Sequence, residues 1–521
     1  MRVFPEGKPS DAGTAGYFME ILIASTALLA LVGAGLIAAR GAVLFTSPLW
    51  LDEHHTLLLS THGSWTGIFS SLARGADFNP PTLFLLERIF GSLMGGADAL
   101  SLRILAVVSV WLTLVVVYAI LRRDFGRPAA FAGALALWAH PFVVYHAFEA
   151  RFYGPLLLFS ALFILTLAAS TDDDRSLPMR IGAGVTAVLL CTVHYFGLFV
   201  WAIVVVTVVF RSWPLQRARL SRALPALAGP VALLACAPLY LGQRASVTVS
   251  TWVPKLSAGQ VKNMLDTFFV TRTPVLAVLV AIGVSLLYKP ISRMSSRNSD
   301  GSSSGTASLV ALAAMPLIIM VFSIVVQPAM IARYAIPAVL IWGPVVAWSV
   351  DRIPRVAQGG VIFLLAAGSA ATLRGTAATS RGFVAALSAD SAVVAPLLKE
   401  GKLVLVPSRH VLYKLATRFP PETRLAFFDF DNTQAKRLFG VNVFHWETNE
   451  SVLERDVGRI HHAIYGFPQL VGTSALDSVP EFYLYLPENA PTSLVTRLMP
   501  DRKTTTLTPR LLRVSKQGPP V

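Results

Sequence analysis

Four ionisable side chains in a row follow the first long apolar run of the chain. They are Asp52, Glu53, His54 and His55, in the segment 49–56 that reads LWLDEHHT. Ionisable groups are costly to place at the edge of a membrane, so there they usually have a function. A carboxylate at this point can take the proton of a hydroxyl nucleophile, which is general-base chemistry. We therefore predict that Asp52 is a catalytic base and that Glu53 positions the reactants beside it.

Each of these side chains also fits a second role. Asp52 suits the N-cap of a helix, where it accepts backbone N–H groups, and this role is compatible with catalysis. His54 and His55, with the adjacent carboxylates, predict a site for a divalent metal, which is Mg, Mn or Zn. Clustered histidines and carboxylates suit Zn or Mn better than Mg. The sequence has no His-x-x-x-His pair. Hydrogen-bonded histidines at the membrane interface are therefore the alternative.

A second motif, Asp77-Phe78-Asn79-Pro80-Pro81, precedes an apolar segment. The two prolines fix the backbone and suit the first turn of a helix. We predict that Asp77 and Asn79 position one of two substrates, either the acceptor that carries the hydroxyl nucleophile or the donor that it attacks. A rigid helix start without a further role is the alternative.

A third motif, Glu149-Ala150-Arg151-Phe152-Tyr153, stands just before another apolar run. We predict that Glu149 and Tyr153 position the acceptor or the donor. The guanidinium of Arg151 can bind a phosphate through two parallel hydrogen bonds. The alternative is an ion pair of Arg151 with Glu149 that anchors the helix end. Arg333 at the start of a late apolar run is a second candidate for a phosphate, although a lone Arg can also reach toward lipid headgroups. His194 lies at a turn between two short apolar runs, as a positioning residue or an interface anchor.

The composition is that of an integral membrane protein. The chain has 521 residues, of which 54% are hydrophobic and 14% are charged, whereas a soluble domain usually has about a quarter charged residues. Its mean hydropathy is +0.61. The net charge of +15 indicates basic cytoplasmic loops and contact with anionic membrane lipids. No nucleic-acid partner is expected, because the sequence has no zinc-ligand pairs and no aromatic RNA-reading motif.

Apolar runs of roughly 20 residues predict about eleven spanning helices. They are 17–40, 101–121, 128–145, 154–170, 181–194, 197–211, 223–242, 273–289, 308–326, 334–350 and 359–374. Short loops rich in Arg or Lys alternate with them and are typical of the cytoplasmic side. These loops are 122–127, 211–222, 289–297 and 351–355.

This count divides the chain into two domains. Residues 1–374 form a transmembrane module with a large outer loop at 41–100, and residues 375–521 form a soluble domain on the same outer face. Short apolar runs at 403–406, 425–428 and 482–486, bounded by Pro, Gly, Asp and Asn, are typical of strands. The predicted fold class is thus an α-helical polytopic membrane protein with a C-terminal extracytoplasmic α/β domain.

The order of these motifs resembles that of the GT-C glycosyltransferases. Asp52-Glu53 after the first span, then Asn79-Pro80-Pro81 and Ala99-Leu100-Ser101-Leu102-Arg103, carry the resemblance, and the motifs at 149–153, 194–195 and 333–334 strengthen it. The most similar branch is the bacterial one related to protein mannosyltransferases, aminoarabinose transferase and the rhizobial lipopolysaccharide galacturonosyltransferases. The resemblance covers about residues 15 to 350 and is specific as a combination.

The resemblance implies transfer of a sugar from a polyprenyl-phosphate donor to an envelope glycan, lipid or protein, with inversion, at the extracytoplasmic face of the inner membrane. It places the base at Asp52, a second acidic group at Glu149, and contacts to the donor phosphate at Arg151 and Arg333. Two other classes stay open, a transporter or flippase of lipid-linked glycans and a glycan polymerase. A transporter predicts ionisable groups at mid-membrane, whereas here they collect at the outer edge.

Overall fold

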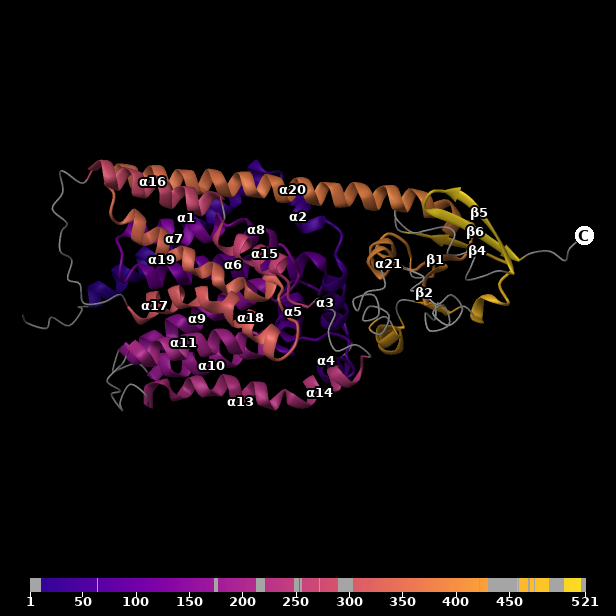
Figure 1. Cartoon of the computed structure of the whole chain (residues 1–521), viewed down its shortest axis with the longest axis horizontal. Coiled ribbons are helices and arrows are strands. Elements are labelled where there is room, and N and C mark those ends of the chain that lie inside the picture. Colours follow the sequence, from indigo (N-terminus) through magenta and orange to yellow (C-terminus); the bar gives the residue numbers. More distant parts are fainter. Residues whose placement is uncertain are drawn as a thin grey trace, which may run out of the picture. The chain divides into compact units, whose positions relative to one another are not determined.

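Figure 1 shows the computed structural model of the chain. Its residue contacts divide it into two compact units. The structure describes residues 11–62, 64–172, 177–211, 221–247, 253, 255–270, 272–288, 303–420, 422–429, 457, 459–466, 469–472, 474–486 and 501–516. Unit 1 consists of Met1–Phe45, Arg103–Ala235 and Lys255–Ala377, and unit 2 of Thr46–Leu102, Cys236–Pro254 and Ala378–Val521. The predicted loop 289–297 and most of the predicted loop 211–222 lie outside the described residues.

Unit 1 is built from helices. Its first half contains α1 (Asp11–Ala38), α2 (Ala42–Thr46), most of α6 (Ala99–Leu121), α7 (Arg127–Trp138), α8 (Pro141–His146), α9 (Tyr153–Asp172), α10 (Leu177–Val193), α11 (Gly197–Arg211), η1 (Leu224–Leu227) and α13 (Ala228–Ala235). Its second half contains α15 (Ala258–Phe269), α16 (Arg272–Tyr288), α17 (Ser304–Ala311), η2 (Leu312–Ala314), α18 (Met315–Val325), η3 (Ala332–Ile341), α19 (Trp342–Val350) and the first part of α20 (Arg355–Lys399).

These helices pack through small residues. In α7 the side chains of Ala129, Ala130, Ala132, Ala134 and Ala136 are all fully buried, and α7 packs against α19. Small side chains let helix backbones approach closely, which is how helices associate where lipid removes the hydrophobic drive. α9 packs against α10 in the same unit.

The described helices fit a multi-pass membrane protein, with fewer long spans than the sequence predicts. Seven helices are long and apolar enough to cross a membrane, or eight if the bent pair Ala258–Phe269 and Thr273–Ser285 counts as one span, within the described residues. Two shorter apolar helices, Leu177–Val193 and Gly197–Arg211, follow each other in sequence. The orientation of these helices relative to the two sides of a membrane stays a prediction.

Two predicted spans differ from the structure. The span predicted at 128–145 is wrong as a single helix, because the chain leaves the helix between α7 and α8. Pro141 has no N–H to continue the α7 ladder, and His140 Nδ1 instead accepts the Phe142 N–H at 3.2 Å as the cap of α8. The span predicted at 359–374 is part of the 45-residue helix α20, which runs on from unit 1 into unit 2.

Unit 2 combines helices of the predicted outer loop with a C-terminal sheet. Its helices are α3 (Leu51–Thr61), α4 (Trp65–Ala73), α5 (Thr82–Leu93), α14 (Ala237–Ala245), the end of α20 and α21 (Arg409–Ala416). The strands are β1 (Val404–Val406), β2 (Leu425–Asp429), β3 (Leu470–Gly472), β4 (Glu481–Tyr485), β5 (Arg502–Thr508) and β6 (Leu511–Lys516), with η4 (Ser474–Leu476) after β3.

The strands form one mixed sheet in the order β3-β2-β1-β4-β6-β5. Figure 1 labels all of them except β3. β1 pairs in parallel with β2 and with β4, and β3 pairs in parallel with β2. β6 pairs antiparallel with β4 and β5. The predicted C-terminal α/β sheet is therefore confirmed, and each apolar run named in the sequence contributes a strand to it. We call this sheet with α21 and the helical residues 459–465 the C-terminal domain.

The unit boundaries cut the chain differently from the two predicted domains. The last boundary, between Ala377 and Ala378, falls close to the predicted one at 374/375. Residues 46–102, however, belong to the same unit as the C-terminal domain. α3, which carries Asp52, thus folds with residues that come more than 300 positions later in the chain.

Candidate active site

The start of α3 places Asp52 and Glu53 in different surroundings. Glu53 is 1% exposed, and its Oε2 accepts the backbone N–H of Trp50 at 3.0 Å. This bond satisfies one of the backbone donors at the start of the helix. Asp52 is only partly buried and stands in the first turn of α3, where the helix dipole favours a negative charge. The N-cap position itself is Trp50, so the capping role considered for Asp52 falls to Glu53.

The segment around Asp77 is fixed by hydrogen bonds. Asp77 Oδ1 accepts the Asn79 N–H at 3.0 Å and the Asn79 side-chain amide at 2.6 Å. Gln243 of α14 donates to the Asn79 carbonyl at 3.1 Å. Gly75 has φ +83°, and a Cβ there would lie 2.7 Å from Ser246 Cβ, so the turn that leads into this segment requires glycine. Asp77 is 4% exposed, and these hydrogen bonds fix the orientation of its carboxylate.

His54 and His55 lie against residues of the C-terminal domain. Arg409 Nη2 donates to His55 Nε2 at 2.6 Å, and the rings of His54 and Tyr413 have centroids 5.2 Å apart. The described residues contain no group of three or more His, Cys, Asp or Glu side chains that can hold a metal ion. The cation of Arg409 on His55 also disfavours a second cation there, because like charges repel. The metal site predicted at His54 and His55 therefore finds no support in the described residues and stays a prediction.

In unit 1, the motif at 149–153 is held at the start of α9. Glu149 Oε2 lies 2.6 Å from His146 Nδ1, so the partner of Glu149 is a histidine of α8. The His146 ring lies 4.3 Å from the Tyr153 ring. A Cβ at Gly154 would lie 2.5 Å from the Ala106 carbonyl oxygen of α6. The close approach of α9 to α6 thus requires glycine immediately after Tyr153.

The positive charges of Arg151 and Arg333 both affect the pKa of one histidine, His194. His194, at the turn between α10 and α11, is 5% exposed and its ring centroid is 3.9 Å from that of Phe152. Its Nδ1 accepts the Phe196 N–H at 3.1 Å. Burial, followed by the positive charges of Arg151 and Arg333, lowers the pKa of His194 to about 3. His194 is therefore neutral at physiological pH, and the positive charge of this cluster comes from the two guanidinium groups.

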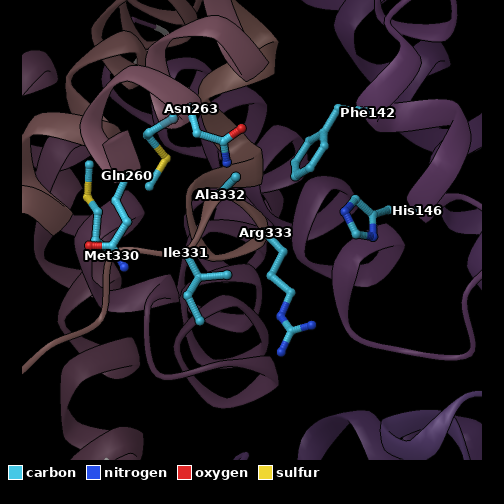
Figure 2. Close-up of a pocket in the computed structure, with 9 residues that line it drawn as sticks. Phe142, His146, Gln260, Asn263, Met330, Ile331, Ala332 and Arg333 are labelled. Carbon is cyan, nitrogen blue, oxygen red and sulfur yellow. The ribbon is translucent and has the colours of Figure 1, made fainter. Parts of the chain in front are cut away.

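A cavity of about 280 Å³ opens beside Arg333 (Figure 2). One part of its lining is polar and contains Arg333, His146, Gln260 and Asn263. The rest is apolar and consists of Phe142, Met264, Met330, Ile331 and Ala332. A cationic group beside apolar side chains is suited to a ligand that has both an anionic and an apolar part.

The predicted site residues thus fall into two groups, one in each unit. Unit 2 brings together the residues around α3, namely Asp52, Glu53, His54, His55, Asp77 and Asn79. Unit 1 brings together Glu149, Arg151, Tyr153, His194 and Arg333. The sequence analysis missed Arg409, Tyr413 and His461 of the C-terminal domain, and it missed His146. No local pattern marks the first three, because they meet His55, His54 and Ala76 through tertiary contacts. His146 lies only three residues before Glu149, so this spacing could have indicated it.

The comparisons with known proteins support the resemblance to glycosyltransferases that the sequence analysis describes. Residues 79–241 match the family described as dolichyl-phosphate-mannose-protein mannosyltransferase. The crystal structure of ArnT from Cupriavidus metallidurans bound to undecaprenyl phosphate is similar, with a TM-score of 0.59 and 14% sequence identity over 94% of this chain and 98% of that chain. The predicted resemblance to the GT-C glycosyltransferases is confirmed.

Further comparisons agree on the fold. The apo structure of the same ArnT also gives a TM-score of 0.59 at 14% identity, over 95% of this chain and 98% of that chain. No curated protein matches the chain. The matched family is one of glycosyltransferases, and the match spans residues 79–241 of this chain.

Proposed function

We propose that the enzyme moves a sugar from a polyprenyl-phosphate donor to an envelope acceptor, which is a glycan, a lipid or a protein, with inversion at the anomeric carbon. The observation that carries the proposal is the pair Arg151 and Arg333 around the neutral His194, with Arg333 lining an amphipathic cavity. A polyprenyl phosphate has both parts that this cavity suits, an anionic head and an apolar chain. Undecaprenyl phosphate bound to ArnT, which shares the fold, supports the same donor class.

The chemistry is a single displacement at the anomeric carbon. The acceptor oxygen forms a bond to this carbon while the bond to the phosphate oxygen breaks, and the electron pair leaves with the lipid phosphate. Asp52 takes the acceptor proton as general base. The guanidinium groups of Arg151 and Arg333 stabilise the phosphate charge that develops as the sugar leaves. Asp77, fixed by Asn79, orients the acceptor.

The proposed location is the inner membrane, with the active site and the C-terminal domain extracytoplasmic. Arg-rich loops support this orientation, since 122–127 and 351–355 are short and basic and such loops stay in the cytoplasm. Lipopolysaccharide is one envelope acceptor that fits this location.

The test is sugar transfer by the purified protein with a panel of polyprenyl-phosphate sugars. We expect Asp52→Asn to lower kcat by about 10²–10⁴-fold, the usual contribution of a general base. Arg333→Gln is expected to raise the KM for the donor by about tenfold or more, because hydrogen bonds to charged groups contribute about 1.5–3 kcal/mol. The matched control is Asp351→Asn, which removes the charge of the side chain that accepts the Gly126 N–H between two predicted cytoplasmic loops. The amide oxygen can still accept this bond, and we expect transfer to stay unchanged.

The outcomes separate the classes. Wild-type turnover by Asp52→Asn would contradict its role as base. Loss of activity with a chelator would support the predicted divalent metal. Absence of transfer with every donor, together with lipid flipping in vesicles, would favour the transporter over the enzyme.

A further inference from the structure

Three buried polar side chains of the C-terminal domain form one cluster against α3. They are Arg409 and Tyr413 on α21 and His461 in the helical residues 459–465. Arg409 and His461 are 0% exposed and Tyr413 is 1% exposed. The first contact is made by Arg409, which donates to His55 Nε2 at 2.6 Å. The His461 ring lies edge-on to His55 with centroids 4.6 Å apart.

The directions of the hydrogen bonds in the cluster follow from the chemistry of their partners. A guanidinium can only donate, so His55 Nε2 is an acceptor. A backbone carbonyl can only accept, so His461 Nε2 donates its proton to the Ala76 oxygen at 2.8 Å. Burial lowers the pKa of His461 to about 3, and the charge of Arg409 adds to this effect. The neutral ring thus has its lone pair on Nδ1, which accepts the Tyr413 hydroxyl at 2.8 Å.

This cluster links the two acidic segments of unit 2. Its contacts to His54 and His55 reach the residues that directly follow Asp52-Glu53. Its bond to the Ala76 carbonyl reaches the residue that directly precedes Asp77. The two segments are 25 positions apart in the chain, and the three side chains of the C-terminal domain bind both.

We propose that Arg409, Tyr413 and His461 are positioning residues that set the placement of Asp52 and Asp77 relative to each other. The inference rests on the proposed function, because it gives these two carboxylates a reaction to serve. The three residues do not contact substrate in this scheme. They act through the backbone of α3 and of residues 76–79.

The chemistry of the cluster favours positioning over mere stability. Burying polar and charged groups is costly unless they are fully hydrogen-bonded, and well-packed apolar side chains often stabilise a core as well or better. Directional hydrogen bonds, in contrast, specify one arrangement of the groups that they join. Catalytic groups need this precision, since a displacement of about 1 Å can lower a rate by about 100-fold.

The experiment compares Tyr413→Phe with Tyr485→Phe. The first removes only the hydroxyl bound to His461 and keeps the ring beside His54. Tyr485 is also in the C-terminal domain and is 0% exposed. The second substitution removes its hydroxyl, which donates to Asp390 at 2.8 Å. We expect Tyr413→Phe to lower kcat about tenfold with the donor KM unchanged, and Tyr485→Phe to leave both constants as in the wild type. Equal kcat values in the two variants would overturn the proposal.

A second readout does not depend on activity. Amide hydrogen exchange of α3 and of residues 76–79 should become at least several-fold faster in Tyr413→Phe and in Arg409→Lys, while Tyr485→Phe leaves these segments protected. Unchanged exchange in Tyr413→Phe would overturn the proposal even if the enzyme used another donor. Faster exchange together with an active Asp52→Asn variant would instead support the positioning and contradict the proposed base.

Discussion

Buried histidines beside arginines recur in both units, as His194 with Arg151 and Arg333 and as His461 with Arg409. In each case burial and the neighbouring positive charge lower the pKa to about 3. A neutral imidazole keeps a lone pair and can accept a hydrogen bond, as His461 does from Tyr413. In unit 1 the consequence is electrostatic, because His194 leaves the positive charge to the guanidinium groups that are proposed to bind the donor phosphate.

The pKa of His461 predicts a dependence of stability on pH. The groups that face this ring are Arg409, Tyr413, Asp77 and His55, with Tyr465 from its own helix. The folded pKa of about 3 lies below the usual value of about 6.5. The unfolded chain therefore binds more protons between these pH values, so the free energy of unfolding falls as the pH drops from about 6.5 toward about 3. At pH 5 the loss is about 2 kcal/mol, from about 1.4 kcal/mol per pH unit over 1.5 units.

Thermal unfolding of the protein in detergent at pH 7 and at pH 5 measures this loss. His461→Gln keeps a hydrogen-bonding side chain and removes the titrating group. The difference in the free energy of unfolding between pH 7 and pH 5 should therefore be smaller in this variant, by about 2 kcal/mol. If His461→Gln lost as much stability as the wild type between pH 7 and pH 5, the titration of His461 would not be the cause of the loss.

At the scale of elements, the close packing of α9 on α6 positions the Arg151 motif. We predict that Gly154→Val destabilises the protein by about 1–3 kcal/mol, the usual cost of overpacking, because its Cβ would lie 2.5 Å from the Ala106 carbonyl oxygen. The donor KM should rise as well, since Arg151 and Tyr153 directly precede this contact. Unfolding temperature and donor kinetics measure the two effects.

The control for this prediction is Gly33→Val in α1, where nothing lies within 4 Å of the added Cβ. This variant should keep both stability and kinetics close to those of the wild type. Similar losses in both variants would mean that the glycine at 154 matters for helix propensity and not for its close approach to α6.

The sequence predicted these elements where local patterns decide the structure. The span predicted at 101–121 corresponds to α6 (Ala99–Leu121), and the apolar runs at 403–406, 425–428 and 482–486 each contain a strand. The prediction was wrong at 128–145, where hydropathy is continuous but Pro141 and the His140 cap end one helix and start another. It also did not find Arg409, Tyr413 and His461, because a contact such as Arg409 to His55 joins residues 354 positions apart and leaves no local pattern.

At the scale of the whole molecule, unit 2 draws on three separate stretches of the chain, and unit 1 on three others. The chain passes between the units several times, and residues 46–102 belong to the same unit as the C-terminal domain. The proposed base Asp52 therefore depends on the C-terminal domain for its surroundings, which a division of the chain into consecutive domains does not reveal.

The orientation of the chain in the membrane can be tested with single cysteines. The natural Cys191 and Cys236 are first replaced by Ala. Arg418→Cys, at an exposed position after α21, should react in intact cells with a thiol reagent that does not cross the inner membrane. Arg127→Cys lies at the start of α7 and at the end of the basic segment 122–127, and its side chain is 69% exposed. The positive-inside rule assigns this segment to the cytoplasm, so the cysteine should react only after the membrane is opened. The reverse pattern would place the C-terminal domain, and with it Asp52, in the cytoplasm, where an extracytoplasmic acceptor cannot reach the proposed base.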